Sequence, residues 1–182
     1  KEPTEKERSA PPDTLLATLK EDTRTFLKDL SSLPITAEAK TRRVKLFIRE
    51  KIEYVNSTEI GEIYKNAGSL YFQKLEELCK ADCDVSAFYG EVILRALGIP
   101  CRMAHGFYVK KDSRFSFAPI AGERHAWLEY FDSRTKTWEI LDVTPPKKEE
   151  DKDENETDES SGGDGELGGD DRERERIAGW RN

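Results

Sequence analysis

The sequence has few cysteines, a single methionine and no long apolar run. The three cysteines, Cys79, Cys83 and Cys101, are an odd and sparse set. They do not resemble the dense disulfide framework of a small secreted scaffold, and at least one thiol stays unpaired. No apolar stretch approaches the ~20 residues that span a bilayer, so we expect no direct membrane insertion. Because the chain begins with Lys1 and its only methionine is Met103, we expect it to be a piece of a longer protein.

Clustered positive charge is also lacking. Residues 147–171 hold 12 acidic residues against three lysines, whereas residues 1–146 carry no net charge. Without a stripe of lysine and arginine on the folded part, we expect no nucleic acid partner. The Glu, Asp, Gly and Ser of residues 147–182 bury too little apolar surface to offset the entropy of ordering. We therefore expect a disordered acidic linker there.

The remaining chain divides into a lead-in and one domain. Residues 1–12 are polar and contain prolines, which indicates a flexible lead-in, and residues 13–146 form the expected domain. Apolar residues at a period of 3.6 predict helices over 13–30, 36–55, 70–79 and 83–97, with a loop at 56–69. Alternating apolar residues predict strands over 101–109, 125–131 and 137–143, with an edge strand around Phe115 and Phe117. Helices followed by strands favour an α+β fold, with helices packed on one side of an antiparallel sheet.

Cys83 stands at the start of the best-marked helix. Gly98 ends that helix, with Pro100 just beyond. The unpaired N–H groups of a first helical turn stabilise a thiolate, which is what a nucleophilic cysteine needs. The alternative is a buried core cysteine, but the flanking Asp82 and Asp84 make burial less favourable.

A thiol nucleophile needs a base within hydrogen-bond reach, and the sequence has only two histidines. His125 opens one predicted strand and His105 lies within another, and each has a structural role as its alternative. Asp142 is a single carboxylate near the end of an apolar strand, where it can orient an imidazole on an adjacent antiparallel strand. The alternative for Asp142 is a cap on the following turn.

Four segments together resemble the transglutaminase-like superfamily. They are residues 81–87 (ADCDVSA), residues 94–102 (LRALGIPCR), residues 125–129 (HAWLE), and Trp138 with residues 141–145 (LDVTP). The resemblance implies a papain-like α+β core with the nucleophile at the start of a central helix. It also implies that Cys83 is the nucleophile, His125 the general base and then acid, and Asp142 the residue that orients the ring. His105 matches no catalytic position.

The resemblance leaves further contacts open. An oxyanion donor besides the backbone N–H of Cys83 is expected from a less regular upstream position, for which Tyr71 and Gln73 are both candidates. Trp127 is a candidate substrate contact, with core packing as its alternative. The implied reaction is attack on an amide bond of a protein or peptide through a thioester, resolved by water or by an amine. The pattern is also similar to prokaryotic members built into membrane-anchored proteins, which implies an extracytoplasmic location.

Two other interpretations compete with an enzyme. Cys79, Cys83, Cys101 and His105 suggest zinc, but Cys101 and His105 are about 13 Å apart on an extended strand, too far to share one ion. The acidic tail lacks the spacing of a calcium loop, so we expect no cofactor. The second rival is a catalytically inactive peptide-binding or scaffold module of a larger protein, which gives no reason to keep the three catalytic residue types.

Overall fold

The computed structural model describes residues 1–107 and 124–145. These residues belong almost entirely to one unit, residues 1–106 and 125–147; a second unit, residues 107–124 and 148–182, lies nearly all outside them. The elements of the chain run in the following order: α1 (Glu5–Arg8), α2 (Asp13–Leu16), α3 (Glu21–Ser32), α4 (Ala37–Lys51), β1 (Glu53–Tyr54), α5 (Thr58–Asn66), η1 (Gly68–Leu70), α6 (Tyr71–Leu78), β2 (Lys80–Ala81), α7 (Cys83–Ala96), β3 (Cys101–Phe107), β4 (Arg124–Asp132) and β5 (Thr137–Leu141).

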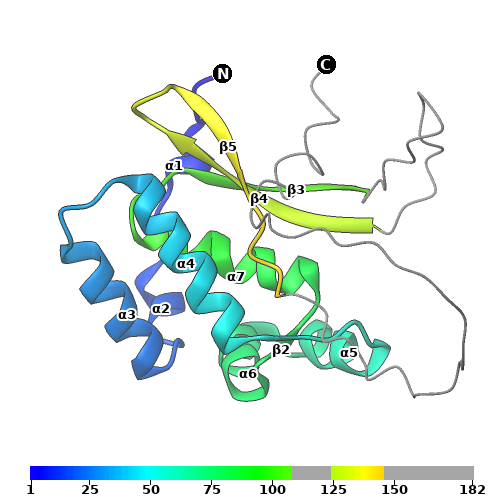
Figure 1. The fold of residues 1–182 in the computed structure, drawn as a ribbon. Coiled ribbons are helices and arrows are strands. Elements are labelled where there is room, and N and C mark those ends of the chain that lie inside the picture. The colour runs from blue at the N-terminus through cyan, green and yellow to red at the C-terminus, as the bar shows by residue number, and fades with distance from the viewer. Residues whose placement is uncertain (108–123, 146–182) are drawn as a thin grey trace, which may run out of the picture. The chain divides into compact units, whose positions relative to one another are not determined.

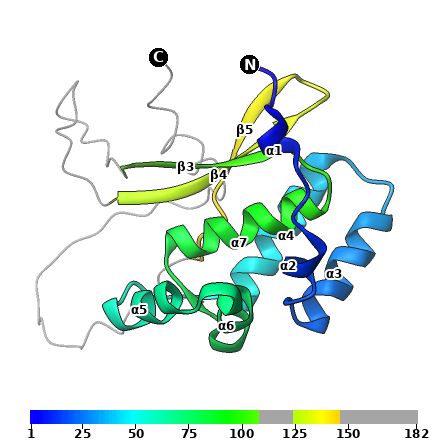
Figure 2. The same cartoon turned by 180° about the vertical axis from the view of Figure 1, so that it is seen from behind.

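The sheet confirms the expected α+β class. Its strands lie in the order β3-β4-β5, and β4 pairs with β5 in antiparallel register, with Leu128 opposite Leu141. In Figures 1 and 2, helices α3 to α7 lie on one side of this sheet. A second, parallel pair of two-residue strands, β1 and β2, was not expected from the sequence. It forms because the backbone after α4 runs beside the short connection between α6 and α7.

Helix α7 is the central helix, and its predicted bounds are confirmed. The Asp82 side chain accepts a hydrogen bond from the Val85 amide at 2.9 Å, which caps the first turn. At the other end Gly98 has φ +72°, the left-handed conformation that ends a helix at low steric cost. The face between these ends is buried. It packs against α4 at Gly90, where a Cβ would lie 3.2 Å from Ile48 Cδ1.

The single helix expected over residues 13–30 is wrong. The chain forms α2 and α3 instead, with a break between Ala17 and Lys20. At the break the Lys20 amide donates to the Glu76 carboxylate of α6, and Leu19 enters the core at 2% exposure. A tertiary hydrogen bond has replaced the helical one, because Glu76 is fully buried and needs donors.

The loop expected over residues 56–69 is also wrong, because α5 and η1 occupy most of it. Ser57 caps α5 by accepting from the Ile60 amide at 3.2 Å. Tyr64, one turn after Ile60, is buried and donates its hydroxyl to the Lys80 carbonyl. The turn-forming residues therefore start a helix whose apolar side packs on the core. The helix expected over residues 36–55 corresponds to α4. Thr36 caps it as expected, but the helix ends at Lys51, so Val55 lies beyond it.

The first twelve residues contain α1, which is closed by a capping box between Thr4 and Glu7. Trp138 of β5 donates its indole N–H to the Lys1 carbonyl at 2.8 Å, and in both views α1 lies beside the sheet (Figures 1 and 2). The flexibility expected of this lead-in stays a prediction. The acidic linker and the edge strand around residues 115–117 lie outside the described residues. No helix in the described ranges has the length and apolar character that a bilayer span requires.

Candidate active site

Cys83 is the first residue of α7 and is half-buried. Its position puts the thiol beside the first-turn N–H groups, which have no partner within the helix. Asp82, immediately before it, is held as the helix cap, and burial raises the pKa of that carboxyl, with the neighbouring Asp84 adding to the rise. The local sequence thus fixes both where the helix begins and where the sulfur stands.

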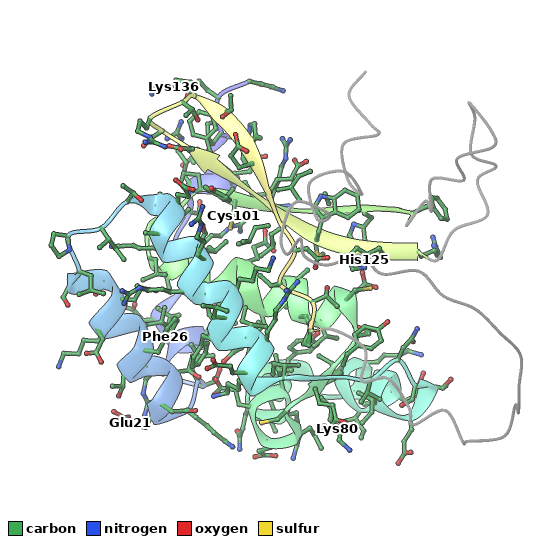
Figure 3. All side chains as sticks on the ribbon, in the orientation of Figure 1. Glu21, Phe26, Lys80, Cys101, His125 and Lys136 are labelled. Atoms are coloured by element: carbon green, nitrogen blue, oxygen red, sulfur yellow. The ribbon has the colours of Figure 1, made fainter. Side chains whose placement is uncertain are left out.

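His125 and Asp142 form a buried pair. Their side chains are 12% and 7% exposed, and His125 Nε2 donates to Asp142 Oδ2 at 3.0 Å. The other carboxylate oxygen, Oδ1, accepts from the Thr144 amide at 2.9 Å. Both oxygens of Asp142 are therefore held by the protein. Figure 3 labels His125, the second residue of β4.

The histidine ring also reaches the thiol. Burial acts to lower the pKa of His125, but hydrogen bonds to Asp142 and to Cys83 outweigh it and raise the pKa to about 9. For Asp142, burial acts to raise the pKa, and the hydrogen bond from His125 outweighs it, so the net shift is downward. Since Nε2 faces Asp142, Nδ1 is the ring nitrogen available to the sulfur. Asp142 is thus hydrogen-bonded to His125, and the contribution of Cys83 to the pKa of His125 places the thiol near the same ring.

The three weaker candidates lie in different surroundings. Tyr71 begins α6, and its ring is 5.6 Å from that of Phe88 on α7. Burial raises the pKa of Tyr71, as do the charges of Asp82 and Asp84, which places the phenol near the start of α7. Gln73 is exposed and donates its amide to Glu77 at 2.9 Å. A role for either residue as oxyanion donor stays a prediction, and the surroundings favour Tyr71.

Trp127 lies beside His125 on the same strand. The two rings stack with centroids 6.2 Å apart, and the indole N–H is buried without a partner among the described residues. A Cβ on Gly106 of β3 would come within 2.7 Å of the indole ring. The indole is thus packed closely between its neighbours, as a residue that shields the histidine would be. A substrate contact stays a prediction.

His105 is engaged elsewhere. Its Nε2 lies 3.3 Å from Asp84 Oδ1, and both side chains are mostly exposed. Cys101 is fully buried, which raises its pKa to about 12, and its thiol faces the Glu91 carbonyl. Cys79 ends α6 in a left-handed conformation. In residues 1–107 and 124–145, no three His, Cys, Asp or Glu side chains are grouped so that they could hold a metal ion.

Two further residues hold Asp142, and sequence reasoning missed one of them, Arg49. The Thr144 amide binds its carboxylate, and Arg49 of α4 donates from Nη2 to its backbone carbonyl at 3.1 Å. The Thr144 contact is the cap on the following turn that we expected as the alternative role of Asp142, and it is present together with the bond to His125. The Arg49 contact spans 93 positions along the chain, and no pattern in the sequence points to it.

Comparison with known proteins agrees with this architecture. The chain is similar to the crystal structure of the periplasmic domain of TgpA from Pseudomonas aeruginosa, at 17% identity and TM-score 0.51, with 75% of this chain and 48% of that one covered. The same domain bound to ethylmercury matches at 18% identity and TM-score 0.49, with 73% and 49% covered. The chain thus spans about half the length of these structures. No curated protein matches the sequence. The family model described as the transglutaminase-like superfamily matches residues 24–143, and the chain belongs to that superfamily.

Proposed function

We propose that this chain is a thiol enzyme that attacks amide bonds of proteins or peptides through a thioester on Cys83. One observation carries the proposal: the His125 ring is hydrogen-bonded to the buried Asp142, and hydrogen bonding with Cys83 contributes to the raised pKa of the same ring. A thiol, a base and an orienting carboxylate in one row are the parts that nucleophilic acyl transfer requires. A binding or scaffold module has no need for this arrangement.

The first half-reaction forms the thioester. The Cys83 sulfur attacks the amide carbonyl carbon, and the carbonyl oxygen takes up the negative charge in a tetrahedral intermediate. The Cys83 backbone N–H and the phenol of Tyr71 are the donors proposed for that oxygen. His125, protonated below its pKa of about 9, then gives its proton to the leaving nitrogen. The C–N bond breaks, the amine departs and an acyl thioester remains.

The second half-reaction releases the acyl group. Water or a primary amine attacks the thioester carbonyl while the now neutral His125 takes its proton, and the C–S bond breaks to regenerate the thiolate. Water gives hydrolysis, whereas an amine gives a new amide bond. Throughout, Asp142 keeps the ring oriented and stabilises the imidazolium each time that it forms.

The test is the reactivity of the three cysteines toward iodoacetamide. Purified protein is labelled briefly at pH 5 to 9, and each site is quantified by peptide mass spectrometry. We expect Cys83 to react about tenfold or more faster than Cys79 and Cys101, because the neighbouring imidazole of His125 can take the proton of its thiol. His125→Ala removes this advantage near pH 6.5, while His105→Ala, the matched control at the other histidine, preserves it.

Slow and equal labelling of all three thiols, unchanged by His125→Ala, would contradict the proposal and favour an inactive peptide-binding module. If Cys83 labels as expected, casein and a fluorescent primary amine then distinguish the fates of the thioester. New N-termini indicate a peptidase, released ammonia indicates a deamidase, and bound fluorophore indicates transfer. Each product must vanish in Cys83→Ala.

We also propose that the chain works outside the cytoplasm, within a membrane-anchored prokaryotic protein. Support comes from the structural neighbour, which is a periplasmic domain. The experiment is a reporter fusion made in the natural parent protein. Activity of an alkaline phosphatase fused after residue 182 is the expected result, because that enzyme needs disulfides that form only in an oxidising compartment. An inactive fusion present at normal abundance would overturn the placement.

A further inference from the structure

Asp142 lies just beyond the end of β5, in a buried segment that crosses the core. β5 ends at Leu141, and residues 142–145 are all buried. Val143 has no exposed surface, and its Cγ2 would lie 3.3 Å from a Cβ built on Gly90 of α7. Figure 1 shows this gold segment running from β5 down toward α4 and α7. Because Asp142 lies outside the strand, pairing within the sheet does not account for its backbone carbonyl, which needs another donor when buried.

Arg49 supplies that donor from α4. Its Nη2 lies 3.1 Å from the Asp142 carbonyl oxygen, at a half-buried position where a charged donor makes a strong hydrogen bond. Asp142 is then held at three points: the carbonyl by Arg49, Oδ1 by Thr144 and Oδ2 by His125. The bond from Arg49 is the only one of the three that ties the backbone of Asp142 to a helix.

We propose that Arg49 is a positioning residue, which fixes the backbone of Asp142 so that its carboxylate meets the His125 ring. The inference rests on the catalytic role proposed for Asp142, although the geometry it describes does not depend on turnover. Arg49 does not touch the reacting atoms. It acts through Asp142, and Asp142 acts through the imidazole.

The positioning role of Arg49 and its positive charge shift the pKa of His125 in opposite directions, and this makes the inference testable. If Arg49 acted only as a nearby cation, its removal would raise the pKa of His125, because a positive charge would no longer oppose protonation. If Arg49 holds Asp142 in place, its removal weakens the hydrogen bond that favours the imidazolium. The pKa of His125 then falls from about 9 toward its ordinary value of 6.5.

The experiment is an NMR titration of the imidazole resonances. The chain has two histidines, so His105→Gln assigns the His125 signal at once. We expect Arg49→Met to lower the His125 midpoint by about one unit or more. Arg49→Lys keeps the charge but lacks the reach and planar fork of Arg, and its His125 midpoint should lie between those of the wild type and Arg49→Met. Arg43→Met, at an exposed position of the same helix, is the matched control and should leave the midpoint unchanged.

A midpoint that stays in place or rises in a folded Arg49→Met variant would overturn the inference. If Arg49→Met does not fold, the midpoint of Arg49→Lys decides by the same criterion. The readout is independent of the proposed enzyme function. If Cys83 of the wild-type protein is not labelled selectively, but Arg49→Met lowers the His125 midpoint as expected, catalysis is refuted and the positioning role stays intact. Selective labelling without any shift would do the reverse.

Discussion

Folding stability should depend on pH through His125. The sign of that dependence distinguishes burial of the ring from its hydrogen bonds. The pKa of His125 is raised from 6.5 to about 9 in the folded protein. At about 1.4 kcal/mol per unit, the shift corresponds to roughly 3 kcal/mol of stabilisation while the ring is protonated in both states. The side chain is only 12% exposed, so solvent screening reduces this figure little.

The folded state binds the His125 proton more tightly than the unfolded chain does. The stabilisation is therefore fully present below pH 6.5 and is lost as the pH rises from 6.5 through about 9. Burial alone predicts the opposite slope, because a ring buried in neutral form stabilises the fold more as the pH rises. The pKa of Asp142 is lowered, so its contribution is present above its ordinary value of 3.8 and is lost as the pH falls below it. The pair therefore stabilises the fold most between pH 3.8 and pH 6.5.

The assay is urea unfolding of wild-type and His125→Asn protein at pH values from 6 to 10. Titrating groups that do not interact with His125 are common to both proteins and cancel in the difference of their unfolding free energies. We expect that difference to fall by about 3 kcal/mol across the range, with equal m-values. Repeating both measurements in a Cys83→Ala background isolates the share of Asp142 and should give a smaller fall. A difference that is flat, or that grows with pH, would refute the assignment of the shift to the two hydrogen bonds.

Three further substitutions test the site and its support. Asp142→Asn should slow thioester formation by about 10²- to 10⁴-fold, because the His125 ring loses its preferred orientation. Stopped-flow acylation by an activated ester measures this rate, and an unchanged rate would show that the carboxylate is not needed. Tyr71→Phe should slow the same step by about 10²-fold if the phenol binds the oxyanion, with little change in urea unfolding, whereas wild-type acylation would remove Tyr71 as a candidate. Gly90→Ala should cost about 1–2 kcal/mol in unfolding free energy, since the added methyl would meet Leu128 Cδ1 at 2.8 Å and overpacking exceeds the gain in helix propensity. A more stable Gly90→Ala protein would show that the neighbouring side chains yield freely.

The parts of the fold that the sequence predicted are those with local signals. Helix α7 carries its start in Asp82 and its end in Gly98, so its bounds follow from capping chemistry alone. Strand β4 follows from alternation, because Ala126, Leu128 and Tyr130 on one of its faces are buried in the core. The break after α2 follows from neither signal. The Lys20 amide leaves the helix for Glu76, 56 positions away, and only the folded chain brings those groups together.

The same division holds for the candidate site. Cys83 was found from its place on a helix, and His125 and Asp142 from residue type and order along predicted strands, with the family resemblance deciding between the histidines. Arg49 carried no such signal, because an arginine on a surface-lying helix is an ordinary residue until its partner is known. Side chains that touch substrate have a recognisable chemistry, whereas those that hold them are specified only by tertiary contacts.

The meeting of His125 with Asp142 follows from the packing of the core. The register of β4 and β5 places Leu128 opposite Leu141, and both are buried. Continued beyond the end of β5, that register sets Asp142 opposite Trp127, so His125, two residues earlier, is its diagonal neighbour on the same face. A slip of one residue would expose Leu141 and turn the carboxylate to the other face. The apolar contact that stabilises the sheet thus also selects the pairing on which the proposed chemistry depends, and Arg49 then sets the backbone where the sheet no longer holds it.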